Sequence, residues 1–271
     1  MERKINKTYQ EGIDRMKIDR NRVLQVFREY TENYNSQDEK VRLKIEHTYR
    51  VSELCECIAR SLKLKEEEVS LAWLLGILHD IGRFEQLKNY GTFVDAQSID
   101  HAMYGAEILF EQGKIRDFIA DTGEDEMIRK AVAYHSAYRL PEGLDERTKM
   151  FCQILRDGDK IDILKVNIDF PLEEIYNVTT NELRNCKVSE AVMEAFKEGH
   201  AVYRGLKKTP ADYVTGHISL VYELVYPKSL AVVKEQGYLK KLMDFQSENE
   251  ETQKQFEQIR EIMNTYLRMR A

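Results

Sequence analysis

Apolar positions recur along most of this chain at intervals of three and four residues, the spacing of one face of an α-helix. Segments 20–33 and 41–62 show this pattern clearly. Segment 65–82, KEEEVSLAWLLGILHDIG, begins with acidic residues and is apolar on all sides in its middle. It therefore predicts a buried central helix that ends at Gly82, with His79 and Asp80 in its last turn.

The remaining pattern is also helical. Residues 83–99 have mixed polarity and predict an ordered loop, and helices are expected over 100–111, 125–138 and 147–166. No segment keeps the period of two that marks a half-buried strand, and the chain has only four prolines. The prediction is an all-α fold, with further helices after residue 169 and a charged terminal helix near 253–269.

Composition and charge restrict the function classes. The formal net charge of −6 does not favour a general nucleic-acid-binding protein. The N-terminus lacks the apolar stretch of a secretory signal, and the most apolar run, around LAWLLGIL, is too short to cross a bilayer. The four cysteines show no paired zinc spacing. We expect a cytoplasmic protein without membrane attachment; the sequence is compatible with a homo-oligomer.

The adjacent pair His79-Asp80 stands out chemically. A buried aspartate needs a partner or a metal ion, and neighbouring residues on a helix diverge by roughly 100°, so a divalent cation fits between them. One such pair is weak evidence, because an isolated buried histidine is more often a hydrogen-bonded core residue. The other candidate ligands, each on or beside an apolar stripe of a predicted helix, are His47, His101, His135 and the acidic string Asp157, Asp159 and Asp162.

The order His, His-Asp, His, His, Asp resembles the HD superfamily of metal-dependent phosphohydrolases. The matching segments are IEHTYRV, LLGILHDIGRFE, SIDHAMYGAEIL, AVAYHSAYRL and LRDGDKID, which together span about residues 40–168. The resemblance implies an HD-domain helical bundle over 38–168, preceded by a helical segment over 1–37. A C-terminal helical extension over 169–271 lies outside the resemblance and is expected to pack on this core as one structural domain, with its apolar helix around 214–226 roofing the cleft.

The resemblance also implies a ligand set. Four ligands, His47, His79, Asp80 and Asp159, would bind one metal ion, and Asp159 is favoured over Asp157 because it directly precedes the basic residue. His101 and His135 occupy the positions where two-metal members bind a second ion, which Asp80 would bridge. The alternative is a one-metal site in which these two histidines contact the substrate. Two divalent transition-metal ions are expected, from Fe, Mn, Ni, Co or Zn, and Mg is also compatible.

Positive groups near such a site would stabilise phosphate charge. We expect Lys160 and Arg83 to have catalytic and substrate-binding roles alongside the catalytic Asp80, and Arg50 and Asp157 to lie on the substrate side.

The predicted activity is hydrolysis of a phosphate ester, as a phosphomonoesterase or phosphodiesterase, through a metal-bound hydroxide. The expected substrate is a nucleotide or a related small phosphorylated metabolite. Two alternatives remain open at this point: an HD-fold mixed-valent diiron oxygenase with the same ligands, and a regulatory module that binds a nucleotide without turning it over.

Overall fold

The computed structural model describes residues 17–270. All regular structure in this part of the chain is helical and no strand is present, which confirms the predicted all-α fold. None of the described helices is both long enough and apolar enough to cross a membrane.

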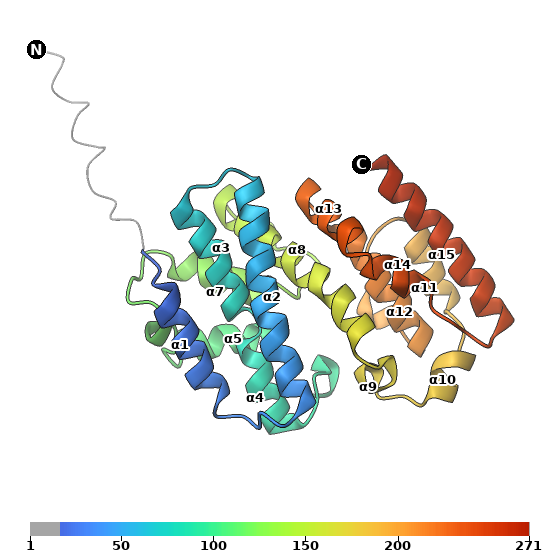
Figure 1. Ribbon diagram of the computed structural model, residues 1–271, viewed down its shortest axis with the longest axis horizontal. Coiled ribbons are helices and arrows are strands. Elements are labelled where there is room, and N and C mark those ends of the chain that lie inside the picture. The colour runs from blue at the N-terminus through green and yellow to red at the C-terminus, as the bar shows by residue number, and fades with distance from the viewer. Residues whose placement is uncertain (1–16, 271) are drawn as a thin grey trace, which may run out of the picture.

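The long helix α8 runs between two groups of helices (Figure 1). The first group lies to one side of α8, and α8 is counted with it. Its members are α1 (Arg20–Thr31), α2 (Glu39–Ser61), α3 (Glu66–Leu78), α4 (Ile81–Tyr90), η1 (Asp95–Gln97), α5 (His101–Phe110), α6 (Ile115–Phe118), α7 (Asp125–Tyr134) and α8 (Glu146–Asp169). Helix α3 is buried along its whole apolar length and packs against α2, α7 and α8.

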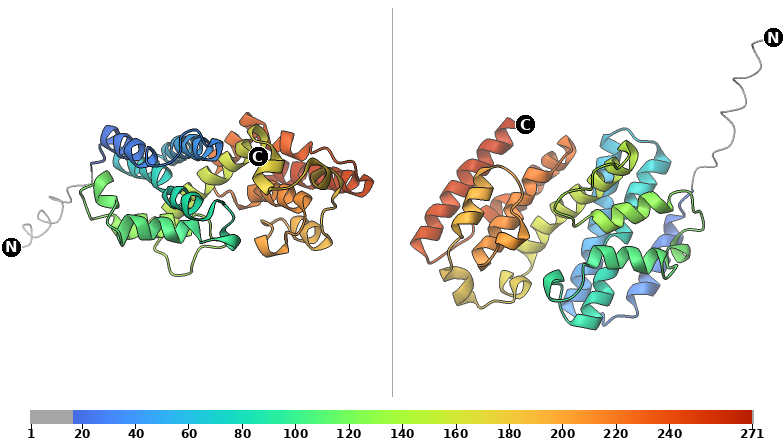
Figure 2. Two further views of the ribbon diagram at one scale, coloured as in Figure 1. Left: turned by 90° about the horizontal axis from the view of Figure 1, so that it is seen from below. Right: turned by 180° about the vertical axis from the view of Figure 1, so that it is seen from behind.

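The second group lies on the other side of α8 and runs from yellow at α9 and α10 through orange to red in Figures 1 and 2. Its members are α9 (Leu172–Tyr176), α10 (Thr180–Asn185), α11 (Glu190–Lys197), η2 (Arg204–Leu206), α12 (Pro210–Ser219), η3 (Leu220–Glu223), α13 (Pro227–Gln236), α14 (Tyr238–Met243) and α15 (Glu250–Met269). Helix α8 contacts α2, α3 and α7 on one side and α12, α13 and α14 on the other. One continuous hydrophobic core therefore runs through both groups.

The structure corrects the predicted element boundaries around His79-Asp80. Helix α3 ends at Leu78, and a new helix, α4, begins at Ile81, inside the segment that the sequence predicts as helix end and loop. Gly82 is therefore not a helix stop; that role belongs to Gly91, which has a φ of 68° at the C-cap of α4. The mixed polarity of α4 reflects burial of only part of its surface.

Gly82 has a packing function instead. A Cβ atom there would overlap the His101 carbonyl and lie 2.7 Å from the Gly105 amide nitrogen. Glycine thus allows α4 to approach α5 closely, and this contact fixes the start of α5, where His101 lies.

We predict that Gly82→Ala lowers the free energy of unfolding by about 1–3 kcal/mol, because the new methyl group must displace backbone rather than a flexible side chain. Thermal and denaturant unfolding would measure the change. Gly123→Ala is the matched control, since its Cβ would meet only the Asp121 side chain at 3.1 Å on an exposed turn. Equal stability of the two variants would contradict this account of the α4–α5 contact.

Candidate metal centre

The predicted ligands converge on one buried point from separate elements. His47 and Asp159 lie in the middle of α2 and α8, whereas His79 and His135 are the C-cap residues of α3 and α7. His101 is the first residue of α5. The backbone can turn at such helix ends, so ligands there can face inward without interrupting a helix.

Asp80 is the N-cap residue of α4 but makes no capping hydrogen bond with its side chain. Its carboxylate is 2 % exposed and directed at the histidines. The positive end of the α4 dipole lies beside this carboxylate and favours its charged form.

The first group of donor atoms surrounds one oxygen of Asp80. The Nε2 atoms of His47 and His79 are 3.3 Å apart and lie 3.7 and 3.5 Å from Asp80 Oδ2. Asp159 Oδ1 is 3.1 Å from His47 Nε2 and 3.8 Å from His79 Nε2. The carboxylate of Asp159 therefore faces the same imidazole nitrogens.

The second group surrounds the other oxygen of the same aspartate. The Nε2 atoms of His101 and His135 are 3.1 Å apart and lie 3.5 and 3.7 Å from Asp80 Oδ1. Asp80 thus stands between two pairs of histidines and presents one oxygen to each pair.

The second nitrogen of every imidazole has its own hydrogen-bond partner. His79 Nδ1 and His135 Nδ1 each lie 2.8 Å from a backbone carbonyl, those of Gly76 and Val132. His47 Nδ1 lies 2.7 Å from Asp162, and His101 Nδ1 lies 2.8 Å from Asp95. Such partners fix the tautomer and leave Nε2 free to coordinate, which is the usual support of metal-binding histidines.

Charge at the centre follows from burial and from these neighbours. Burial alone would raise the pKa of Asp80, but the ammonium of Lys44 and then His79 lower this pKa well below its ordinary value. Burial lowers the pKa of His79 to about 3, and burial followed by Arg83 lowers the pKa of His101 to about 4. These two imidazoles are therefore neutral at pH 7 and able to donate a lone pair.

The donor set fits divalent transition-metal ions. Two groups of buried side chains, His47-His79-Asp80 and Asp80-His101-His135, hold ligand atoms within 4.8 Å of one another. Imidazole nitrogen with carboxylate oxygen suits Mn, Fe, Co, Ni or Zn. The observation that decides the fit is the convergence of four Nε2 atoms on the carboxylate of one buried aspartate, because histidines buried for packing alone need not direct these atoms at a common point.

Lys44 is a component of the site that the sequence predictions missed. Its Nζ lies 2.7 Å from Asp80 Oδ2, and its ammonium is 5.5 Å from the centre of the Phe93 ring. Lys44 precedes His47 by three residues, so both lie on one face of α2, and this spacing was the signal available in the sequence.

Two aspartates support the histidine ligands: Asp162, which the sequence includes among the candidate ligands, and Asp95, which the sequence predictions missed. Asp95 and Asp162 hold His101 and His47, but only Asp162 lies on a helix with a predicted ligand. Asp95 comes from η1, in the segment predicted as loop, and no periodic pattern places it at the site.

The predicted positive groups are engaged with carboxylates that support the site. Arg50 forms two hydrogen bonds with Asp162, at 2.7 and 2.9 Å, and so braces the partner of His47. Arg83 donates to Asp95 at 2.8 Å and has its Nε 3.7 Å from Asp80 Oδ1. Lys160 is buried and forms an ion pair of 2.7 Å with Glu223. Their roles toward a substrate stay predictions.

Asp157 is engaged with the C-terminal helices. Its carboxylate is fully buried and accepts hydrogen bonds from the amides of Val225 and Tyr226 and, at 2.6 Å, from the Ser229 hydroxyl. It therefore anchors the C-terminal helices to α8, and its predicted place on the substrate side stays a prediction. On α8, Asp157 and Asp159 point in different directions because residues two apart do not share a face.

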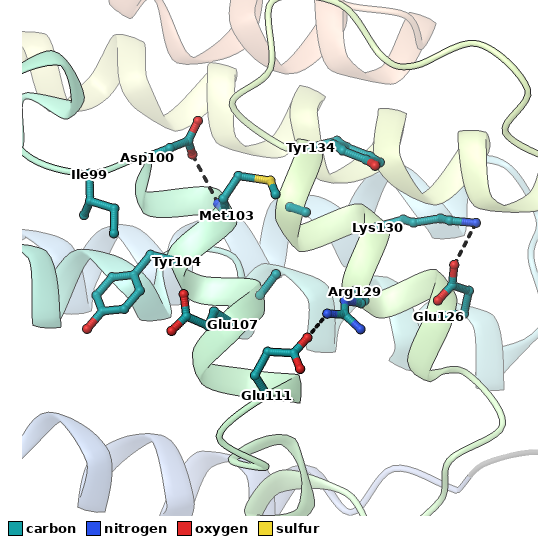
Figure 3. A pocket seen from close by; sticks show the side chains of 12 residues that line it. Ile99, Asp100, Met103, Tyr104, Glu107, Glu111, Glu126, Arg129, Lys130 and Tyr134 are labelled. Atoms are coloured by element: carbon teal, nitrogen blue, oxygen red, sulfur yellow. Dashed lines mark hydrogen bonds and ion pairs between the residues drawn. The ribbon is translucent and has the colours of Figure 1, made fainter.

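A surface groove between α5 and α7 is separate from this centre (Figure 3). Met103 and Tyr104 line it together with the ion pairs Arg129–Glu111 and Lys130–Glu126. None of the predicted metal ligands is among the residues that line it.

Comparison with known proteins gives a family match for the part of the chain that carries the candidate ligands. Residues 45–165 match the model of a family described as "HD domain". This segment is an HD domain. It contains His47, His101, His135 and Asp159 together with the His79-Asp80 pair, and so confirms the resemblance found in the sequence.

One relative is "3'3'-cGAMP-specific phosphodiesterase 1" of Vibrio cholerae serotype O1, which is 29% identical over 147 residues. The match covers 52% of this chain and 31% of the relative, so the chain aligns with about a third of that protein. No solved structure matches significantly.

The HD-domain geometry distinguishes two aspartates on one helix. We predict that Asp159→Ala lowers the metal content of the purified protein while the fold persists. Asp157→Ala should instead retain the metal and lower the free energy of unfolding by about 2–4 kcal/mol, because it leaves buried amides without an acceptor. Elemental analysis and thermal unfolding of both variants would test this. Metal loss in Asp157→Ala with retained metal in Asp159→Ala would reverse the assignment of Asp159 as the ligand.

Proposed function

We propose that this chain is a metal-dependent hydrolase of phosphate esters that acts on a nucleotide or a related small phosphorylated metabolite. The observation that carries the proposal is the position of Asp80, whose two oxygens each face a separate pair of histidines. Two metal ions sharing one carboxylate are a recurrent arrangement in enzymes that cleave phosphate esters.

The ligands of the two ions would be divided between the two sides of Asp80. His47, His79 and Asp159 would hold one ion, and His101 and His135 the other. When bound, divalent ions supply a nucleophile by lowering the pKa of water, and they neutralise charge on the phosphoryl group. No side chain of the protein then needs to attack the phosphorus atom.

The name of the relative supports a phosphodiesterase acting on a nucleotide as the more specific proposal. The HD domain is the part of this chain that carries the proposed ligands, and the aligned length is close to the size of that domain. The predicted ligand set is complete, which supports turnover over a role in binding alone.

The proposal is tested by loading the protein anaerobically with Mn, Fe, Co or Ni and screening phosphate esters, including nucleotides and 3'3'-cGAMP, for hydrolysis. We expect turnover by the wild type, and loss of both turnover and metal in His79→Ala and Asp80→Ala. Retained metal in both variants would contradict the assignment of the site. Oxygen consumption by the iron-loaded protein without phosphate-ester hydrolysis would favour an oxygenase. Tight nucleotide binding without turnover would favour a regulatory module.

Lys44 is expected to stabilise negative charge on the substrate. Its ammonium is the cation closest to Asp80 among the described residues, and a phosphate oxygen bound at the centre would come within its reach. In metal-free protein the same ammonium compensates the buried carboxylate.

We predict that Lys44→Met lowers kcat by about 10²-fold, the usual effect of removing one group that stabilises transition-state charge, with metal content retained. Lys40→Met is the matched control, because Lys40 lies one turn earlier on α2 and is exposed. Steady-state kinetics with elemental analysis provide the measurement. Unchanged turnover in Lys44→Met would show that Lys44 only neutralises Asp80.

A further inference from the structure

The segment between α11 and α12 extends from the C-terminal helices to the HD domain. The Ala201 carbonyl accepts a hydrogen bond of 3.1 Å from Tyr138, which follows the proposed ligand His135 by three residues. The rings of Tyr138 and Tyr203 pack edge to face at 5.2 Å. Arg204 Nη1 lies 3.7 Å from Asp95 Oδ2, the carboxylate that holds His101. Residues 201–204 therefore lie near the second pair of histidines.

Lys207 ends this segment in an unusual environment. Its side chain lies along α12 at Gly216, where a Cβ atom would be only 2.8 Å from Lys207 Cδ and 3.3 Å from Nζ. The ammonium is 5.4 Å from the centre of the Tyr213 ring. Tyr213 stacks on Tyr176, which in turn stacks on His217. A glycine and uncharged aromatic side chains thus form the surroundings of the Lys207 side chain.

The Lys207 ammonium has no ion-pair partner in the described part of the chain. Among residues 17–270, no carboxylate lies within 4.0 Å of Lys207 Nζ and no acceptor hydrogen-bonds to it. The carboxylate of Asp212 already accepts from the amides of Ser189, Lys208 and Thr209 and from the Ser189 hydroxyl. His217 contributes no charge, since burial, followed by the nearby Lys207, lowers its pKa to about 3.

A second cation lies nearby. Burial and then the positive charge of Arg204 lower the pKa of Lys207 to about 8, against a smaller opposing effect of Asp212. Arg204 is 59% exposed, and Asp95 already accepts shorter hydrogen bonds from Arg83 and Gln86. Arg204 is therefore free to turn toward a ligand. A Lys207 ammonium that lies near Arg204 and has no ion-pair partner of its own among the described residues is a local cost that a bound anion removes.

We propose that Arg204 and Lys207 form an anion subsite that binds a second, non-reacting phosphate of the substrate while the scissile phosphate lies at the metal centre. This inference rests on the proposed function and specifies it: the substrate class would be phosphodiesters with two phosphate groups, such as dinucleotides. Lys207 is partly buried but not closed off, and Arg204 connects it to the His101 side of the centre through Asp95. Both residues act on specificity, not on bond cleavage.

The first test compares two substrates of the metal-loaded protein. Bis(p-nitrophenyl) phosphate carries one phosphodiester, and 3'3'-cGAMP carries two. We expect Lys207→Met and Arg204→Met each to lower kcat/KM for 3'3'-cGAMP by about 10- to 100-fold, the effect of losing a charge-assisted contact. Hydrolysis of bis(p-nitrophenyl) phosphate should change by less than about twofold. Lys208→Met is the matched control, because Lys208 is exposed and its side chain has no partner among the described residues.

A second test does not depend on turnover. Acetylation of lysines at pH 8, read by peptide mass spectrometry, should modify Lys207, and inorganic pyrophosphate should protect Lys207 but not Lys208. Two results together would overturn the subsite. The variants would show no loss of kcat/KM that is selective for 3'3'-cGAMP, and pyrophosphate would not protect Lys207 from acetylation. If the wild type hydrolyses neither diester, the more specific proposal of a phosphodiesterase fails, and the protection experiment alone decides whether the anion subsite exists.

Discussion

The structure depends on a single buried carboxylate. Asp80 is 2 % exposed and lies among four imidazoles, a position that a charged group occupies only when opposite charge compensates it. In the chain itself Lys44 provides that compensation, at 2.7 Å. Two features of the fold place the metal-ligand atoms around the Asp80 carboxylate. The close contact between α4 and α5 at Gly82 positions His101, and the break between α3 and α4 turns Asp80 inward.

The supporting residues explain why the HD domain does not stand apart from the C-terminal helices. Helix α8 carries Asp159 at the centre, Asp162 behind His47, and Asp157, which holds the segment that follows η3. Lys160 and Arg156, on the same helix, share Glu223 of η3. A displacement of the C-terminal helices would therefore move α8 and with it a proposed ligand. This coupling gives the extension a physical route by which to influence the site.

Most of the fold could be predicted because it depends on local periodicity. The three- and four-residue spacing located α1, α2, α5 and α8 to within three residues at each end, and the order of His and Asp residues located the HD domain. The predictions were wrong where contacts between segments far apart in the sequence determine the local structure. Helix α4 has mixed polarity and depends on its contact with α5, so it appeared as loop. The contacts of Asp157 could not be predicted, because its partners, Val225, Tyr226 and Ser229, lie about seventy positions away along the chain. Asp95 likewise contacts His101 from a segment in which apolar and polar residues follow no helical period.

The most direct test of the central claim is the position of bound metal. Crystals of protein loaded with Mn, measured near the Mn absorption edge, should show two anomalous peaks about 3.5–4 Å apart, one on each side of Asp80. One peak should lie against His47, His79 and Asp159, and the other against His101 and His135. A single peak with His101 and His135 uncoordinated, or no peak at Asp80 in metal-saturated protein, would contradict a shared carboxylate as the organising feature of this structure.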